Sequence, residues 1–300
     1  MPSTILVKDL RKNYPDVHAV DGVSFEVAQG EFFGILGPNG AGKTTTLEII
    51  EGLREADSGE VTLLGLRPWP RNPRLLPRIG VQLQATSFFE RLTVREQIRT
   101  FASLYGLPAE AADRMLDVVG LTDRAGARTE ALSGGQAQRL SIACALVHRP
   151  EVIFMDEPTS GLDPQARRNL WDLLRQINAR GHTVVLTTHY MDEAETLCDR
   201  VAIMDGGKIL KLGAPAALVR DLNSPVRITI ESGILPPAEI ARLRQDAEVR
   251  DDGVSLTIAT RDPSPVLVRL AELGALSGLR VRGATLEDLF LELTGREYRA

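Results

Sequence analysis

The chain has 300 residues, room for one large domain or for a catalytic domain with a smaller companion. With 43% hydrophobic and 25% charged residues it has the composition of a globular protein, which excludes a disordered chain. The net charge of −5 argues against a strongly basic nucleic-acid-binding protein. Lysine is scarce, so a motif that requires it is informative. The five lysines are Lys8, Lys12, Lys43, Lys208 and Lys211.

The sequence also indicates where the chain works. Its two cysteines, Cys144 and Cys198, are far apart and outside any metal-binding motif, which favours reduced thiols in the cytosol. No apolar stretch approaches the roughly 20 residues that a membrane-spanning helix needs. The first residues lack the basic and then apolar layout of a signal peptide. We therefore expect a cytoplasmic chain that reaches a membrane only through a partner.

In chain order, the first elements indicate a phosphate-binding unit. Apolar alternation predicts strands at residues 5–7, 23–27 and 61–64. A short apolar run at 32–36 leads into a glycine-rich turn, and a helical pattern from 44 to about 52 follows at once. A strand, a glycine loop and a helix in this order are typical of a βα unit that binds phosphate.

The middle of the chain predicts short helices and then buried strands. Residues 86–150 are mostly helical in pattern, and Thr93 with Glu96 has the spacing of a capping box. A helix is predicted at 164–180, between the first two of three apolar runs. These runs are typical of parallel strands buried on both faces, and they lie at 152–155, 183–186 and 201–204.

The composition changes near residue 220, and a different pattern follows. It predicts strands and helices in the order βαββαβ, at 226–231, 236–245, 247–250, 254–259, 264–274 and 279–282. One apolar helix face then follows, formed by Leu286, Leu289, Phe290 and Leu293. We expect a small α+β domain at this end of the sequence.

The glycine-rich turn fits the phosphate loop GxxxxGK[ST] at each fixed position. Its residues are Gly37, Pro38, Asn39, Gly40, Ala41, Gly42, Lys43 and Thr44. Glycines let backbone N–H groups approach phosphates, and the following helix adds the positive end of its dipole. Lys43 is predicted to reach the β- and γ-phosphates and Thr44 to bind Mg²⁺. The alternative is an ordinary turn before a helix, which the scarcity of lysine disfavours.

The buried run at 152–155 ends in two carboxylates, Asp156 and Glu157. Alone, such a pair often marks only a strand end that meets solvent. Together with the phosphate loop, it predicts that Asp156 holds Mg²⁺, directly or through water. Glu157 is then placed to polarise the attacking water as a general base.

A third motif indicates the family that the sequence resembles. Leu132, Ser133, Gly134, Gly135 and Gln136 read LSGGQ, the signature of the ATP-binding-cassette (ABC) ATPases. Alone, a serine and glycine before a helix would be an N-cap. With the other two motifs in order, residues 1 to about 220 resemble one complete ABC nucleotide-binding domain.

That resemblance implies an α/β P-loop NTPase fold. It implies a RecA-like core, an antiparallel β subdomain and a helical signature subdomain at about 86–150. Residues 221–300 form the accessory α+β domain in this interpretation. The implied activity is ATP hydrolysis with ATP and Mg²⁺.

The family's other site residues can be matched singly. Tyr14 fits the aromatic residue that stacks on adenine, although a plain surface tyrosine is the alternative. Gln84 fits the Q-loop glutamine that contacts Mg²⁺ and the attacking water, with the neighbouring Gln82 leaving the register open. His189 fits the switch histidine that bonds the γ-phosphate, although a lone histidine at a strand end is more often structural. Thr45 completes the set of ATP-binding residues.

The same resemblance implies partners. The signature residues Ser133, Gly134, Gly135 and Gln136 and the D-loop residue Asp163 would face ATP bound to a second subunit. One chain has one cassette with intact motifs, so we expect a homodimer around two Mg-ATP. The residues from Gln84 to Leu92 lead into the region where transporters receive the coupling helices of a membrane subunit.

The C-terminal segment from Gly283 to Gly295 resembles that of ABC-2-type exporter ATPases, including drug-resistance and daunorubicin-export cassettes. An ABC-2-type integral-membrane permease is therefore the expected partner, with this chain peripheral on the inner face of the cell membrane. No nucleic acid is expected. The alternative is a soluble ABC ATPase that is not coupled to transport.

Overall fold

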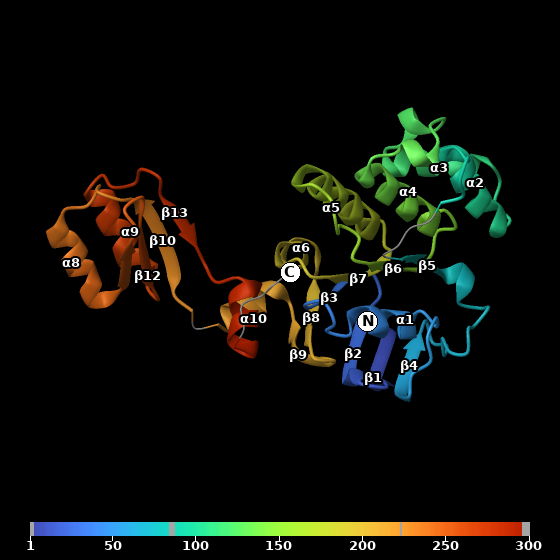
Figure 1. The fold of residues 1–300 in the computed structure, drawn as a ribbon, viewed down its shortest axis with the longest axis horizontal. Helices are drawn as coiled ribbons and strands as arrows, with labels where there is room; N and C mark the ends of the chain where they lie inside the picture. The colour runs from blue at the N-terminus through green and yellow to red at the C-terminus, as the bar shows by residue number, and fades with distance from the viewer. Residues whose placement is uncertain (1–2, 84–87, 223, 296–300) are drawn as a thin grey trace. The chain divides into compact units, whose positions relative to one another are not determined.

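The computed structural model describes residues 3–83, 88–222 and 224–295 (Figure 1). The chain divides into two compact units, the first ending at Pro215 and the second beginning at Ala216. Among the described residues, no helix combines the length and the apolar character that a membrane span requires. The composition change near residue 220 follows directly after helix α7 (Pro215–Arg220).

A six-stranded sheet forms the centre of the first unit. Its strands are, in spatial order, β5 (Ile79–Gln82), β6 (Val152–Asp156), β7 (Thr183–Thr188), β3 (Phe32–Leu36), β8 (Arg200–Asp205) and β9 (Lys208–Gly213). The first five strands run parallel, and β9 is antiparallel to β8. Every residue of β3, β6 and β7 is buried. The continuous apolar runs are thus confirmed as parallel strands covered on both faces.

A second sheet in this unit is antiparallel and has the order β2-β1-β4. Its strands are β1 (Ser3–Tyr14), β2 (Val17–Ala28) and β4 (Ser58–Leu63). The first two are longer than the sequence predicted, because irregular register between Val7 and Leu10 interrupts the alternation. The third ends one residue earlier than predicted, since Leu64 adopts a left-handed φ of 51°.

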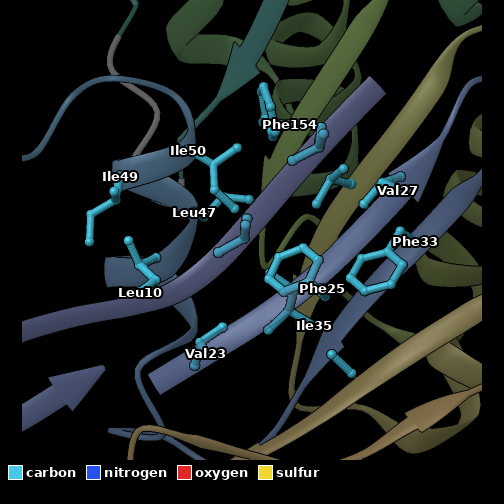
Figure 2. Packing of buried hydrophobic residues seen from close by; sticks show 14 of the residues in the cluster. Leu10, Val23, Phe25, Val27, Phe33, Ile35, Leu47, Ile49, Ile50 and Phe154 are labelled. Carbon is cyan, nitrogen blue, oxygen red and sulfur yellow. The ribbon is translucent and has the colours of Figure 1, made fainter. Parts of the chain in front are cut away.

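The two sheets share an apolar core (Figure 2). Side chains from β1, β2, β3 and helix α1 (Lys43–Ile50) interdigitate there, and the rings of Phe25 and Phe33 stack with centroids 5.0 Å apart. Leu47 and Ile50 on one face of α1 and Phe154 on β6 belong to the same core. This packing fixes β3, α1 and β6 with respect to one another, and it therefore also positions the ends of the loops that join them.

Five further α-helices of the first unit lie between successive strands of the central sheet in the chain. They are α2 (Val94–Leu104), α3 (Glu110–Val119), α4 (Gly134–Leu146), α5 (Pro164–Ala179) and α6 (Met191–Leu197). Helices α2 to α4 form a group between β5 and β6 in the chain. The predicted capping box of Thr93 and Glu96 is present at the start of α2. Helix α5 connects the parallel neighbours β6 and β7, as expected of a crossover.

The second unit contains the predicted βαββαβ succession. Its elements are β10 (Val226–Glu231), α8 (Pro237–Asp246), β11 (Glu248–Asp251), β12 (Ser255–Thr260), α9 (Pro263–Glu272), β13 (Arg280–Arg282) and α10 (Leu286–Thr294). The strands form an antiparallel sheet of order β11-β12-β10-β13. Ile228, Ile258 and Leu270 are fully buried in a core of its own.

Candidate nucleotide site

The predicted phosphate loop joins β3 to α1. Gly42 precedes the helix with a left-handed φ of 96°, and a Cβ there would lie 2.0 Å from the carbonyl oxygen of Ala19. A Cβ on Gly37 would lie 2.3 Å from the carbonyl oxygen of Met204. Glycine is therefore required at position 42 by conformation and by space, and at position 37 by space. The loop places the N-terminus of α1 at the carboxyl edge of the parallel sheet, where N–H groups can receive anions.

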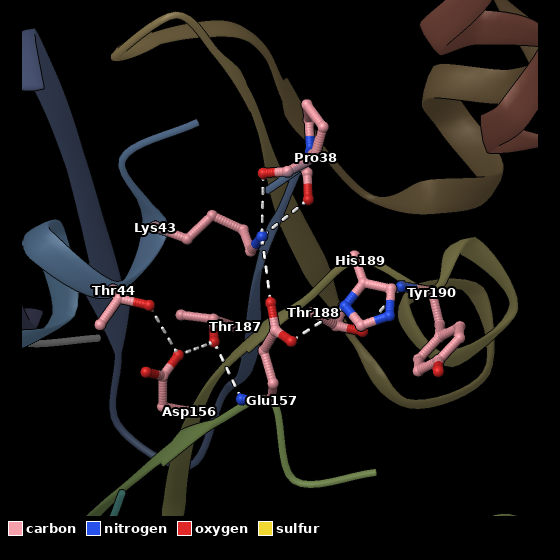
Figure 3. A network of polar contacts seen from close by, with 10 residues as sticks. Pro38, Lys43, Thr44, Asp156, Glu157, Thr187, Thr188, His189 and Tyr190 are labelled. Atoms are coloured by element: carbon pink, nitrogen blue, oxygen red, sulfur yellow. Dashed lines mark hydrogen bonds and ion pairs between the residues drawn. The ribbon is translucent and has the colours of Figure 1, made fainter. Parts of the chain in front are cut away.

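Lys43 is the cation of this site (Figure 3). Its side chain is 4% exposed, and its Nζ donates to the carbonyl oxygens of Gly37 at 2.8 Å and Pro38 at 3.1 Å. The same Nζ lies 3.2 Å from Oε1 of Glu157. Lysine and carboxylate are thus buried as a pair, with the loop carbonyls satisfying the remaining hydrogen-bonding capacity of the ammonium group.

Asp156, at the end of β6, is held by hydroxyl groups. Oδ1 of this residue accepts hydrogen bonds from Oγ1 of Thr187 and, at 3.2 Å, from Oγ1 of Thr44. Burial raises the pKa of Asp156 above its usual value, and the neighbouring carboxylate of Glu157 adds to the effect. A carboxylate and a hydroxyl group are the hard oxygen donors that Mg²⁺ prefers. The residues present therefore fit that ion.

Glu157 stands at the turn after β6. Its φ is 47°, in the left-handed region, and its N–H donates to Oγ1 of Thr187 at 3.0 Å. While Oε1 faces Lys43, Oε2 lies 3.0 Å from Nδ1 of His189 (Figure 3). The carboxylate therefore lies between the ammonium group of Lys43 and the imidazole of His189, which together fix its orientation.

The structure thus brings together five predicted residues: Lys43, Thr44, Asp156, Glu157 and His189. Thr187 completes the cluster, and the sequence analysis did not select it. Its position in a buried apolar run was the available signal, since a buried hydroxyl group needs a partner.

The sequence also predicts a contact with adenine from Tyr14 and a contact with Mg²⁺ from a Q-loop glutamine. Tyr14, at the end of β1, is 37% exposed, with the cationic groups of Lys12 and Arg54 at 6.0 and 5.6 Å from its ring centre. Gln84 lies outside the described residues. Gln82, the alternative, is buried in β5 and its Nε2 donates to the carbonyl oxygen of Leu83.

The residues predicted to act across a dimer cap two helices. Ser133 and Gln136 form a capping box at the start of α4, which also contains Gly134 and Gly135. Asp163 caps α5 by accepting from the N–H groups of residues 165 and 166 at 2.9 and 2.8 Å. Within the described residues, no hydrogen bond or ion pair joins either cap to the phosphate loop.

Comparisons with known proteins agree with this geometry. The ABC transporter family model matches residues 20–160. The Nod factor export ATP-binding protein I of Paraburkholderia xenovorans is 41% identical and covers 99% of each chain. The protein of the same name from Ralstonia nicotianae is 40% identical over 98% of this chain and 94% of its own.

Solved structures match most of the chain. An ATP-binding subunit of an ABC transporter gives a TM-score of 0.65 at 30% identity, over 73% of this chain and 93% of its own. A dimeric ATP-binding cassette in a post-hydrolysis state, bound to ADP and Pi, gives 0.63 at 28% identity, over 70% and 98%.

The fold and the site define the class first: this is an ABC ATPase cassette, a P-loop protein of the α/β type. Sequence similarity over nearly the whole chain then establishes the family, and the chain belongs to the ATP-binding proteins of ABC transporters. It binds ATP and hydrolyses it as the ATP-binding subunit of a transporter.

Proposed function

We propose that this chain powers an exporter by hydrolysing ATP beside a separate ABC-2-type membrane permease, on the inner face of the membrane. The observation that carries the proposal is the extent of similarity to the Nod factor export proteins. It covers 99% of this chain in one relative and therefore includes the second unit as well as the cassette. By comparison, the two solved structures described above cover 73% and 70% of the chain.

The chemistry proposed for the site follows from the cluster. Glu157 orients and deprotonates the attacking water, and His189, at 3.0 Å from its Oε2, fixes the carboxylate and reaches the γ-phosphate. Phosphate oxygens compete with Glu157 for the Lys43 ammonium group, which frees the carboxylate to act as base. Mg²⁺, held by Thr44 and Asp156, would neutralise charge on the β- and γ-phosphates. Tyr14 and Gln84 complete the proposed adenine and magnesium contacts.

A second copy of the chain supplies the rest of the proposed site. Ser133 and the glycines after it form a helix N-terminus with free N–H groups, which suits a γ-phosphate. Asp163 lies at the start of α5, beyond the turn that follows Glu157. Since the described part of the chain has no hydrogen bond or ion pair between either cap and the phosphate loop, we propose that both caps face the nucleotide of the partner subunit. The dimeric cassette among the structural neighbours supports this arrangement.

The proposed docking surface for the permease is a groove between the core and the α2–α4 group. Exposed apolar side chains line it, including Leu53 at 43%, Leu83 at 49% and Tyr105 at 38% exposure. Glu51 is buried at its base and has a carboxylate oxygen without a hydrogen-bond partner in the described part of the chain. An apolar segment of a partner would cover these side chains.

The test is affinity purification of the tagged chain from its own cells in mild detergent. A stoichiometric membrane protein with several spanning helices is the expected result, and capture of soluble partners alone would favour a soluble ABC ATPase. Leu53→Arg should abolish that capture while ATP hydrolysis by the isolated chain continues. Val254→Arg is the matched control, since Val254 is 81% exposed and is not among the residues that line the groove.

A further inference from the structure

A buried carboxylate lies next to the nucleotide site and has no role in the chemistry described above. Glu193 belongs to α6, four residues after His189, and its side chain is fully buried. Ionisable groups are rarely buried unless they are paired or hydrogen-bonded, because burial removes their hydration. A buried Glu193 is therefore expected to have polar partners.

Three segments converge on this carboxylate. Trp171 on α5 donates from Nε1 to its Oε1 at 2.9 Å. Burial raises the pKa of Glu193, and the nearby hydroxyl groups of Thr188 and Thr159 oppose that shift. Oγ1 of Thr159 and Oε2 of Glu193 have no hydrogen-bond partner in the described part of the chain. Both threonines are themselves buried. Thr159 lies in the turn that follows Glu157, and Thr188 ends β7 directly before His189.

Tyr190, the residue after His189, has two further contacts. Oγ1 of Thr188 accepts a hydrogen bond from the N–H of Tyr190 at 2.9 Å. The guanidinium group of Arg167, on α5, lies 3.7 Å from the centre of the Tyr190 ring. Tyr190, directly after His189, is therefore anchored to α5, which begins at the Asp163 cap, and Thr188 is bonded to Tyr190.

We infer that Glu193 is a positioning residue, which holds the His189 segment in register with the turn from Thr159 to Asp163. This inference rests on the role proposed for His189. A carboxylate with one geometrically good hydrogen bond in a dry environment costs stability compared with a hydrocarbon side chain of similar size. Its advantage is directional, because it accepts a hydrogen bond from Trp171 and presents polar oxygens near the hydroxyl groups of Thr159 and Thr188, while an apolar side chain can accept from none of them.

The test compares Glu193→Leu and Glu193→Gln in the full chain. Glu193→Leu should lower kcat for ATP by at least about tenfold, because a displaced catalytic group is costly even when the change lies behind it. The KM for ATP should stay within about threefold and the Tm should not fall, since only positioning is lost. Glu193→Gln should keep most of the activity, because its amide oxygen still accepts from Trp171 and its NH₂ can donate to Thr159.

Two further variants keep the inference falsifiable. Trp171→Phe removes the hydrogen bond but keeps an aromatic ring, and it should lower kcat in wild type but not in Glu193→Leu. Glu195→Gln, an exposed glutamate on the same helix, is the matched control. Wild-type kcat in Glu193→Leu, or a loss of kcat that only follows a loss of folded protein, would overturn the inference. If His189→Ala keeps full activity, the role proposed for His189 is wrong, and the Glu193 variants still report on Glu193 itself.

Discussion

At the residue scale, the carboxylate that we propose as the general base is held by two partners. Glu157 contacts Lys43 through one oxygen and His189 through the other, and its N–H is bonded to Thr187. Such anchoring pre-organises a base for one geometry. The carboxylate of the neighbouring Asp156 has different partners from that of Glu157, namely the hydroxyl groups of Thr44 and Thr187. Two adjacent carboxylates therefore have separate environments, which is how one site can assign one to a metal and the other to water.

Glu157→Gln tests the role of the base. We expect kcat for ATP hydrolysis to fall by about 10²- to 10⁴-fold, while ATP still binds because the phosphate loop is unchanged. Steady-state hydrolysis together with equilibrium binding of labelled ATP measures both quantities. Glu151→Gln, which changes a half-exposed surface carboxylate paired with Arg78, should hydrolyse ATP at the wild-type rate. Retention of more than half of kcat in Glu157→Gln would exclude Glu157 as the base.

The burial of Glu51 makes the stability of the folded chain depend on pH. Burial raises its pKa well above the usual value, so the folded chain binds a proton that the unfolded chain has released. The free energy of unfolding therefore falls as the pH rises from the unfolded pKa to the folded one. Glu51→Gln has no ionisable group at this position, so its free energy of unfolding should not fall in this way. The difference in free energy of unfolding between Glu51→Gln and wild type should therefore be at least about 1 kcal/mol more favourable to the variant at pH 8 than at pH 5.

Urea unfolding at the two pH values measures that difference. Glu55→Gln, an exposed glutamate four residues later, should show none of it. An advantage of Glu51→Gln that is equal at both pH values would contradict the assignment of the effect to a buried carboxyl group.

At the scale of elements, helices α2 and α4 begin with the same kind of cap but are proposed to differ in function. Thr93 and Glu96 form a capping box on α2, and Ser133 and Gln136 form one on α4. Replacing either cap by alanine should cost about 1 kcal/mol, because an N–H group at the helix end loses its acceptor. Only Ser133→Ala should also lower ATP hydrolysis, since only α4 carries the signature.

Thermal melts and ATPase assays of Thr93→Ala and Ser133→Ala make this comparison. Thr93→Ala serves as the control for lost helix stability. Equal loss of activity in the two variants would mean that Ser133 acts as a cap alone.

The elements also show how far the sequence could be interpreted. Apolar runs without interruption predicted β6 and β7, and the motifs at their ends predicted Asp156, Glu157 and His189. Strand β9 was not predicted, because Lys208 and Lys211 interrupt its apolar residues on the half-exposed edge of the sheet. The bond from Trp171 to Glu193 joins residues 22 apart through tertiary packing. No local pattern could have revealed it.

At the scale of the whole molecule, the proposed dimer depends on nucleotide. ATP bridges the phosphate loop of one chain and the signature of its partner in this proposal, so it should bind the dimer better than the monomer. Glu157→Gln should therefore shift to dimer mass with Mg-ATP and remain monomeric with Mg-ADP. Light scattering after size-exclusion chromatography measures the mass. Adding Ser133→Ala should weaken the shift, and a monomer with either nucleotide at high concentration would contradict the proposal.

The distribution of lysine over the two units has a practical consequence. All five lysines lie in the first unit, and the last two, Lys208 and Lys211, belong to β9, just before the second unit begins. Amine-reactive dyes and supports therefore attach through side chains of the cassette and leave those of the second unit unmodified. A lysine-specific endoprotease acting on the unfolded chain releases residues 212–300 as one peptide. The accessory unit can thus be recovered from the natural protein, and its ability to refold alone can be measured without recombinant truncation.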